Sequence, residues 1–146
     1  MNKRIFIYSL MPVMLVAIVA VFTGCGKKLS NEEKAVAGKY GLVEYSVSVW
    51  PNRGIDDFDF YTMELKSNKK GIIKVKLKTE TAVTTSKATW ELNQYGKNIE
   101  IRISTKVGKN KNVQKFIFDE DTLYMSDYSI LTGTTTILKF KRLGAA

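Results

Sequence analysis

Apolar and polar residues take turns along most of the chain from Tyr40 onward, and this period of two constrains the fold more than any other feature. In the clearest segment, Ile73, Val75 and Leu77 are separated by lysines. Successive side chains of a strand point to opposite faces, so such a segment has one dry face and one wet face. No helical period competes with this pattern. It predicts antiparallel strands, and in the first of them the residues expected to point inward are Val43, Tyr45, Val47 and Val49.

The connections between these segments are short and have the composition of turns. Residues 67–71, 93–97 and 108–112 each combine Gly with Asn, Ser or Lys, and an acidic turn spans 119–121. Such sequences favour hairpins. The pattern indicates eight or nine strands and the chain has only two prolines, so we predict an all-β fold, an up-and-down antiparallel β-barrel over residues 38–146. Closure into a barrel leaves no open edge, whereas a two-sheet sandwich is the alternative.

The first 24 residues have a different character. Lys3 and Arg4 precede an almost wholly apolar run over residues 5–22, which ends at Phe22-Thr23-Gly24-Cys25. This order is typical of an export signal. A transmembrane helix is the alternative, because 18 apolar residues come close to the roughly 20 that cross a bilayer. Pro12 and the cysteine favour cleavage, and the positive N-terminus places the domain outside the cytoplasm in both cases.

The tetrapeptide that ends at Cys25 resembles the lipobox of bacterial lipoproteins. This resemblance implies that the Cys25 thiol receives a diacylglyceryl group, and that cleavage before it removes residues 1–24 as a signal peptide. The protein is then expected to be lipid-anchored on the extracytoplasmic face of the cell membrane, its first partner. Two or three acyl chains hold a protein there stably, whereas one does not.

Residues 25–37 are expected to form a short tether between the lipid and the barrel. Ser30 and Glu33 have the spacing of a capping box, which predicts a helix from Asn31 to Ala37 that ends at Gly38. The part that remains after cleavage is long enough to bury one core without disulfides or metals.

The barrel region contains the short motifs Gly38-Lys39-Tyr40-Gly41-Leu42-Val43, Met63-Glu64-Leu65-Lys66 followed by Gly71, Ala88-Thr89-Trp90-Glu91-Leu92 with Ile99-Glu100-Ile101, and Leu138-Lys139-Phe140-Lys141-Arg142. Together these motifs resemble the small bacterial lipocalin-like domains of the calycin group. Proteins of this kind begin with Gly-x-Trp on the first strand, and a basic residue of the last strand packs across that ring. Tyr40 and Arg142 match these two positions, with Tyr in place of Trp. The resemblance implies that both residues close the barrel, and it carries fold rather than function.

The composition argues against an enzyme and against a transition-metal centre. The chain has no histidine, and its one cysteine precedes the domain, so the usual base of a nucleophilic triad and the usual zinc or copper ligands are missing. Asp56, Asp57 and Asp59 offer oxygen atoms to calcium, but an ordinary acidic loop is the alternative. We therefore expect no cofactor, no metal and no catalytic residue.

Basic residues dominate the charge. The formal net charge is +9, to which the leader contributes Lys3 and Arg4. Lys74, Lys76 and Lys78 alternate onto the outer face of one predicted hairpin. They form either a solvated face or a surface for an anionic envelope component, lipid headgroups or acidic wall polymers. Nucleic acid is not expected, because the protein is exported and no aromatic residues interleave with the lysines.

The barrel interior carries the main functional prediction. By the lipocalin resemblance, the expected function is non-catalytic binding of a small hydrophobic ligand inside the barrel. Large side chains can equally fill an eight-stranded barrel. The protein would then be an envelope or protein-interaction module with a filled core and a basic outer face, and an open cavity would decide between the two. The candidate ligand-binding residues are Tyr45, Trp90, Ile101, Phe116 and Phe140.

Overall fold

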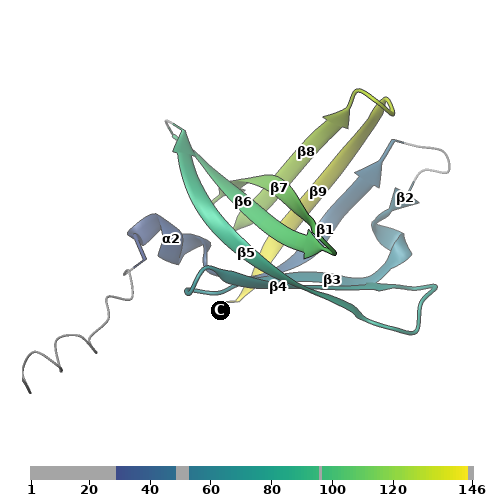
Figure 1. Cartoon of the computed structure of the whole chain (residues 1–146), viewed down its shortest axis with the longest axis horizontal. Helices are drawn as coiled ribbons and strands as arrows, with labels where there is room; N and C mark the ends of the chain where they lie inside the picture. Colours follow the sequence, from purple (N-terminus) through teal and green to yellow (C-terminus); the bar gives the residue numbers. More distant parts are fainter. Residues whose placement is uncertain (1–28, 49–52, 96, 145–146) are drawn as a thin grey trace, which may run out of the picture.

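The computed structural model describes residues 29–48, 53–95 and 97–144, and nearly all of them belong to one antiparallel β-barrel (Figure 1). The predicted signal peptide, Cys25 and Val49 lie outside these residues. A short helix, α2 (Asn31–Val36), precedes the first strand. The remaining elements are β1 (Gly38–Val47), β2 (Arg53–Gly54), the 3₁₀ turn η1 (Ile55–Asp57), β3 (Phe58–Leu65), β4 (Lys70–Leu77), β5 (Thr84–Tyr95), β6 (Asn98–Val107), β7 (Asn110–Asp119), β8 (Thr122–Ser129) and β9 (Thr134–Gly144).

The strands form a closed ring in chain order. Each strand from β3 to β8 pairs antiparallel with the strand that follows it, and β1 pairs with β3. The ring closes where β9 pairs with β1, for example at Leu42↔Phe140. The short β2 pairs with Ser46 and Val47 of β1 and is not a member of the ring. The prediction of an all-β, up-and-down antiparallel barrel is therefore confirmed, and the sandwich is not adopted. Closure leaves no complete strand edge exposed.

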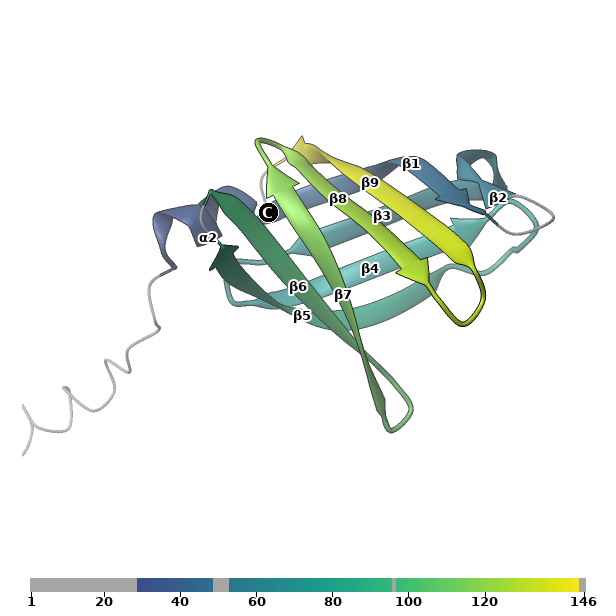
Figure 2. The same cartoon turned by 90° about the horizontal axis from the view of Figure 1, so that it is seen from above.

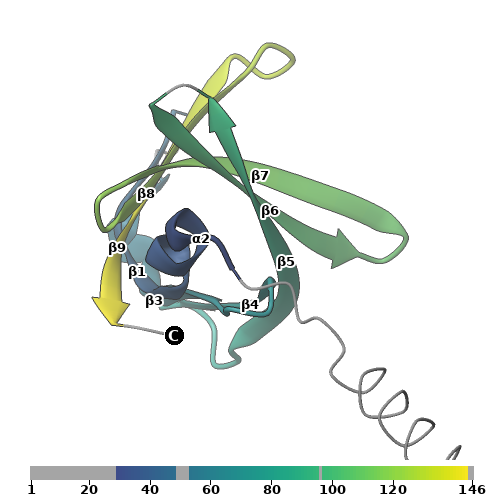
Figure 3. The ribbon, with the colours of Figure 1, turned by 90° about the vertical axis from the view of Figure 1, so that its left-hand side faces the viewer.

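Helix α2 covers one end of the barrel, as the end-on view shows (Figure 3). We call this the closed end, where the turns at 66–69 and 120–121 also lie, and we call the opposite end the open end. The predicted capping box is present: the Glu33 amide donates to Ser30 Oγ at 3.2 Å, and the Ser30 amide donates to Glu33 Oε2 at 2.9 Å. No helix among the described residues is long and apolar enough to cross a membrane.

Strand β1 departs from the predicted alternation at Val43. We expected this side chain to point inward, but it is 47% exposed. Between the pairs Leu42↔Phe140 and Glu44↔Lys139, β1 has one residue more than β9. This β-bulge moves the inward face of β1 by one residue, because the side-chain period of a strand is two. The prediction for Val43 is therefore wrong.

The core draws on every strand of the ring and on α2. Its residues alternate with exposed ones along each strand, as the period of two predicts. At the closed end, Val36 of α2 packs with them in one cluster. The buried apolar residues are Val36, Tyr40, Met63, Leu65, Ile73, Ala88, Trp90, Ile101, Ile103, Phe116, Phe118, Leu123, Leu138 and Phe140.

Candidate functional site

Five aromatic side chains contact one another in succession across the barrel interior, from Tyr45 in β1 to Phe116 in β7. Tyr45 meets Phe58 edge to face at 4.8 Å between ring centroids, and Phe58 meets Tyr61 at 5.7 Å. Tyr61 in turn contacts Phe140 at 5.0 Å, and Phe140 contacts Phe116 at 6.0 Å. Edge-to-face pairs at these distances are favourable beyond the area they bury. These contacts place aromatic side chains across part of the barrel interior.

The five predicted ligand-binding residues are all brought to the interior. Trp90, Ile101, Phe116 and Phe140 are buried in the core, and Tyr45 is half-buried and packs against it. The indole Nε1 of Trp90 donates to the Lys66 carbonyl at 2.9 Å, so its polar atom is satisfied within the protein. These side chains are packed against one another, which favours the filled interior over the cavity.

Tyr40 and Arg142 meet at the closed end. The Arg142 guanidinium carbon lies 5.1 Å from the centroid of the Tyr40 ring, and Arg142 Nη2 donates to the Tyr40 hydroxyl at 2.9 Å. Arg142 also donates to the Ala35 carbonyl and to the Ala37 carbonyl, the latter at 2.8 Å. The Tyr40 hydroxyl donates to the Val36 carbonyl at 2.6 Å. Together these contacts bind the end of α2 to β1 and β9.

The environment of Tyr40 holds its hydroxyl in the neutral form. Burial raises the pKa of Tyr40 to about 12, although the charge of Arg142 acts to lower it and that of Asp121 adds to the rise. The phenol must be neutral here, because its O–H donates a hydrogen bond to the Val36 carbonyl of α2. The Tyr40–Arg142 pair therefore joins β1, β9 and the end of α2, and its assignment to barrel closure stays a prediction.

Sequence reasoning missed a second contact between α2 and the barrel. Lys69 pairs with Glu33 of α2, and its ammonium lies 4.4 Å from the centroid of the Trp90 ring. Its backbone is in the left-handed region, at φ 65°, within the β3–β4 turn. Lys69 and Glu33 are 36 positions apart in the sequence, so no local pattern points to this contact.

The strongest surface feature is a group of lysines on the outside of β9, β1, β3, β4 and β5, which we call the lysine face. Two rows of outward residues cross these strands in register. One row contains Lys39, Glu64, Ile72 and Lys87, and the other contains Lys141, Gly41, Thr62, Lys74 and Thr85. None of the salt bridges among the described residues uses a lysine of this face. Its members are Lys39, Lys66, Lys70, Lys74, Lys87 and Lys141.

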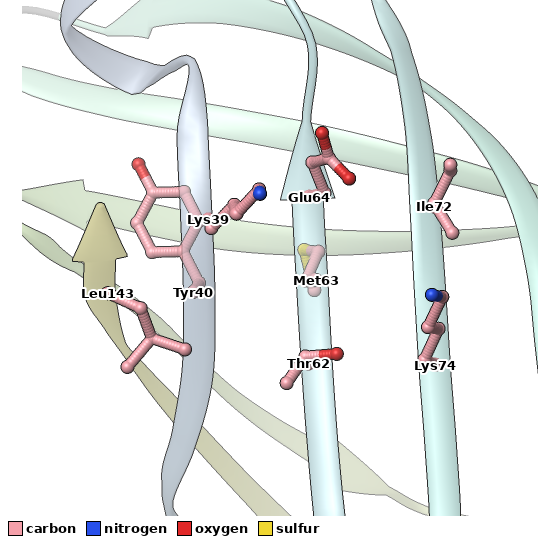
Figure 4. Close-up of a pocket in the computed structure, with 8 residues that line it drawn as sticks. All are labelled: Lys39, Tyr40, Thr62, Met63, Glu64, Ile72, Lys74 and Leu143. Atoms are coloured by element: carbon pink, nitrogen blue, oxygen red, sulfur yellow. The ribbon is translucent and has the colours of Figure 1, made fainter. Parts of the chain in front are cut away.

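Two shallow grooves lie in this face, on either side of Ile72. The first, of about 210 Å³, has Lys39 and Lys74 at its rims and Ile72 and Leu143 among its lining residues (Figure 4). The second, of about 470 Å³, continues over β4 and β5 past Lys70 and Lys87. Glu64 also lines the first groove, whereas the second has lysines and no acidic residue in its lining. Cations beside apolar surface suit an anion that carries apolar parts, and the second groove fits this description better.

The predicted outer lysines have different surroundings. Lys74 is exposed within the lysine face, as expected from the alternation. Lys76 also points outward, but it is half-buried and its ammonium pairs with Asp59 at 2.6 Å. Lys78 is exposed just beyond the end of β4, where its amide donates to the Asp57 carbonyl. The basic surface thus extends toward the closed end of the barrel rather than along Lys76 and Lys78.

The acidic residues that we considered for calcium have partners within the protein. Asp57 Oδ2 accepts from the Gly54 amide at 3.2 Å, and Asp59 pairs with Lys76. Across the described ranges, no three or more metal-ligating side chains gather in one place. The ordinary acidic loop is the interpretation that these contacts favour.

Comparison with known proteins gives no information on function, so the proposals below are argued from the residues and their geometry. No protein-family model, no curated protein and no solved structure matches this chain.

Proposed function

We propose that this protein is a lipoprotein of the cell envelope, anchored through Cys25, whose barrel is a non-catalytic interaction module with a filled core. The observation that carries this proposal is the pairing of a ring-filled interior with a lysine face whose ammonium groups lie outside the salt bridges of the described residues. The lysine face binds anionic lipid headgroups and holds the barrel against the membrane that carries its anchor.

The position of the lysine face supports this orientation. Only four residues, 26–29, separate Cys25 from the capping residue Ser30. At about 3.5 Å per residue, the start of α2 lies within roughly 18 Å of the lipid surface. Lys66 and Lys70 flank the turn at the closed end, next to α2. The anchor therefore brings the lysine face to headgroup distance.

Vesicle binding tests the lysine face without the anchor. The chain from residue 26 onward, which contains the whole ring, is expected to bind anionic phosphatidylglycerol vesicles and not neutral phosphatidylcholine vesicles. Each lysine near an anionic surface contributes about 1 kcal/mol, so three Lys→Gln changes at Lys39, Lys74 and Lys87 should weaken partitioning about 100-fold. The matched control removes three exposed lysines that line neither groove of the lysine face: Lys97, Lys109 and Lys115.

Added salt should weaken vesicle binding, because exposed charges are screened within about 10 Å at 0.1 M. Equal losses from both lysine sets, or binding that salt does not change, would refute the role of this face. Binding to a soluble acidic polymer with no binding to anionic vesicles would assign the face to wall polymers instead.

Metabolic labelling tests the anchor separately. Radiolabelled palmitate should be incorporated into the full chain and should be lost in Cys25→Ala, in which the leader also stays uncut. Label that persists in Cys25→Ala would contradict anchoring at this residue. The earlier expectation of a small hydrophobic ligand inside the barrel stays a prediction, and a ligand-dependent rise in the thermal midpoint with any of several lipid classes would restore it.

A further inference from the structure

The barrel wall has a gap between β7 and β8. These strands share only three residue pairs, Ile117↔Tyr124, Phe118↔Leu123 and Asp119↔Thr122, all next to their turn. Beyond them, β7 remains paired with β6 and β8 remains paired with β9. Figure 2 shows β7 and β8 diverging from their shared turn toward the open end. Residues 110–116 and 125–129 therefore have a partner strand on one side only, and we call the space between them the β7–β8 notch.

The notch is a cleft of usable size. It has a volume of about 500 Å³ and is lined by residues 112–115 of β7 and 125–127 of β8. Sites that hold small ligands have volumes of about 300–1,000 Å³. The cleft is therefore large enough for a short stretch of extended peptide.

Unpaired backbone groups face into the notch. Asp119 and Thr122 close a two-residue turn, so their backbone groups pair with each other across the hairpin. Alternate residues of a strand direct their N–H and C=O groups to the same side, which assigns Val113 and Lys115 of β7 to the notch side. Among the described residues, no backbone hydrogen bond from a turn or loop reaches these groups. A second strand would satisfy them.

The same barrel contains a precedent for this arrangement. Strands β1 and β3 also separate, after the pair Gly41↔Thr62. There the chain itself supplies the short strand β2, which pairs with Ser46 and Val47 on the edge that β3 has left. Among the described residues, the β7–β8 notch has no such strand. An added strand is thus the occupant that this fold already uses at an equivalent gap.

The side chains along the rim define the sequence that would fit. Val113 is 44% exposed between two lysines of β7, Lys111 and Lys115, and all three point outward. Directly opposed residues of paired strands interact, so an apolar residue suits Val113 and acidic residues suit the lysines. On the other rim, Tyr128 is 61% exposed and adds apolar surface. The same lysines disfavour a second copy of this edge, because like charges would face each other.

We propose that the β7–β8 notch binds an extended segment of a partner protein, which pairs antiparallel with β7. The segment places an apolar residue opposite Val113 and an acidic residue two positions before and after it. Main-chain hydrogen bonds supply the affinity and the alternating side chains supply the specificity, as in other cases of strand addition. This proposal depends neither on the lipid anchor nor on the lysine face.

Selection from a displayed library of random 12-residue peptides, with the full chain in mild detergent as the target, tests the proposal. Selected peptides should share the pattern acidic-x-apolar-x-acidic. Val113→Pro should weaken their binding about tenfold or more, because it removes a donor and obstructs pairing. The Val113 amide faces the notch and not β6, so this substitution keeps the β6–β7 ladder. The matched control, Val113→Thr, should change binding less than threefold.

Charge reversal provides a second test that does not depend on proline. The double variant Lys111→Glu and Lys115→Glu should lose the acidic peptides and gain peptides with lysine at the same two positions. Failure to select any peptide, or selected peptides that bind wild type, Val113→Pro and the double variant equally, would overturn the proposal.

Hydrogen exchange locates the binding. The amides of Val113 and Lys115 should exchange rapidly in the free chain and become protected when a selected peptide is added. Protection already present in the free chain would mean that another segment or a second copy occupies the notch, and it would also overturn the proposal. Sedimentation would then separate those two occupants, since only a second copy raises the mass.

Discussion

The guanidinium of Arg142, in the last strand, lies 5.1 Å from the centre of the Tyr40 ring in the first strand and donates a hydrogen bond to its hydroxyl. The same guanidinium donates to the carbonyls of Ala35 and Ala37. These carbonyls belong to the end of α2, where a helix leaves acceptors unsatisfied. Arg142 therefore completes the closed end of the barrel by joining the last strand, the first strand and the helix.

Replacing Arg142 should loosen the closed end. Arg142→Leu removes three hydrogen bonds and is expected to lower the free energy of unfolding by about 3 kcal/mol, since each bond contributes roughly 1 kcal/mol. Urea denaturation measures this loss. Arg142→Lys should recover part of it, because lysine keeps the charge but lacks the planar fork. The exposed neighbour Lys141 offers the control, and Lys141→Leu should change stability by less than about 0.5 kcal/mol. Equal effects of Arg142→Leu and Lys141→Leu would contradict this role.

Stability should fall in alkaline solution through Tyr40. Burial raises the pKa of Tyr40 to about 12 in the folded protein, above the ordinary value of about 10 for tyrosine. The folded state therefore retains the phenolic proton more strongly, so this contribution to stability is complete below about pH 10 and is lost as the pH rises toward 12. Urea midpoints measured from pH 9 to 12 should fall less steeply for Tyr40→Phe than for wild type. Parallel curves would show that Tyr40 does not carry this dependence.

Val43 and Phe116 should differ in their tolerance of substitution, because the β-bulge turns Val43 outward whereas Phe116 lies in the core. Phe116 is fully buried and packs on Phe140, so Phe116→Ala should cost about 3–5 kcal/mol in unfolding free energy. Val43 is turned outward by the bulge, and Val43→Thr should change stability by less than about 0.5 kcal/mol. Thermal or urea unfolding of both variants checks the pair. A loss of more than 1 kcal/mol for Val43→Thr would place that side chain in the core instead.

Two turn residues with positive φ should respond in opposite directions. Glu120 has φ 51°, a conformation that costs a residue with a side chain about 1 kcal/mol. Asparagine tolerates it better, so Glu120→Asn should raise the unfolding free energy by up to about 1 kcal/mol. Gly108 has φ 63°, and Gly108→Ala should lower the unfolding free energy by a similar amount. Shifts of the same sign in both variants would rule out backbone strain as the cause.

The strands of the barrel follow from local sequence wherever the ladder is regular. Residues 73–77 and 99–103 alternate as predicted, and Ile73, Ile101 and Ile103 are buried. The capping box at Ser30 was also predictable, because both of its partners lie within one turn. In each case the relevant geometry is set by neighbours a few residues apart, which the sequence displays directly.

The sequence predictions fail, or miss a contact, where segments far apart in the chain meet. The Val43 bulge depends on how β1 registers against β9, and the pairing of Lys69 with Glu33 depends on where α2 docks. Alternation correctly placed Lys74 outward, but it did not show that Lys39, Lys87 and Lys141 share one face with it. Such groupings need the order of strands in space.

The sequence by itself determined the class of fold, because a period of two and short turns leave an antiparallel barrel as the economical closed solution. It also supplied the residues that fill the interior. Only the tertiary structure decided that these rings contact one another, that the lysines of the lysine face share one surface, and that β7 and β8 separate beyond three residue pairs. Each of these features depends on how strands are placed relative to one another in space. Such contacts form, and contribute to the free energy of folding, only when the barrel closes.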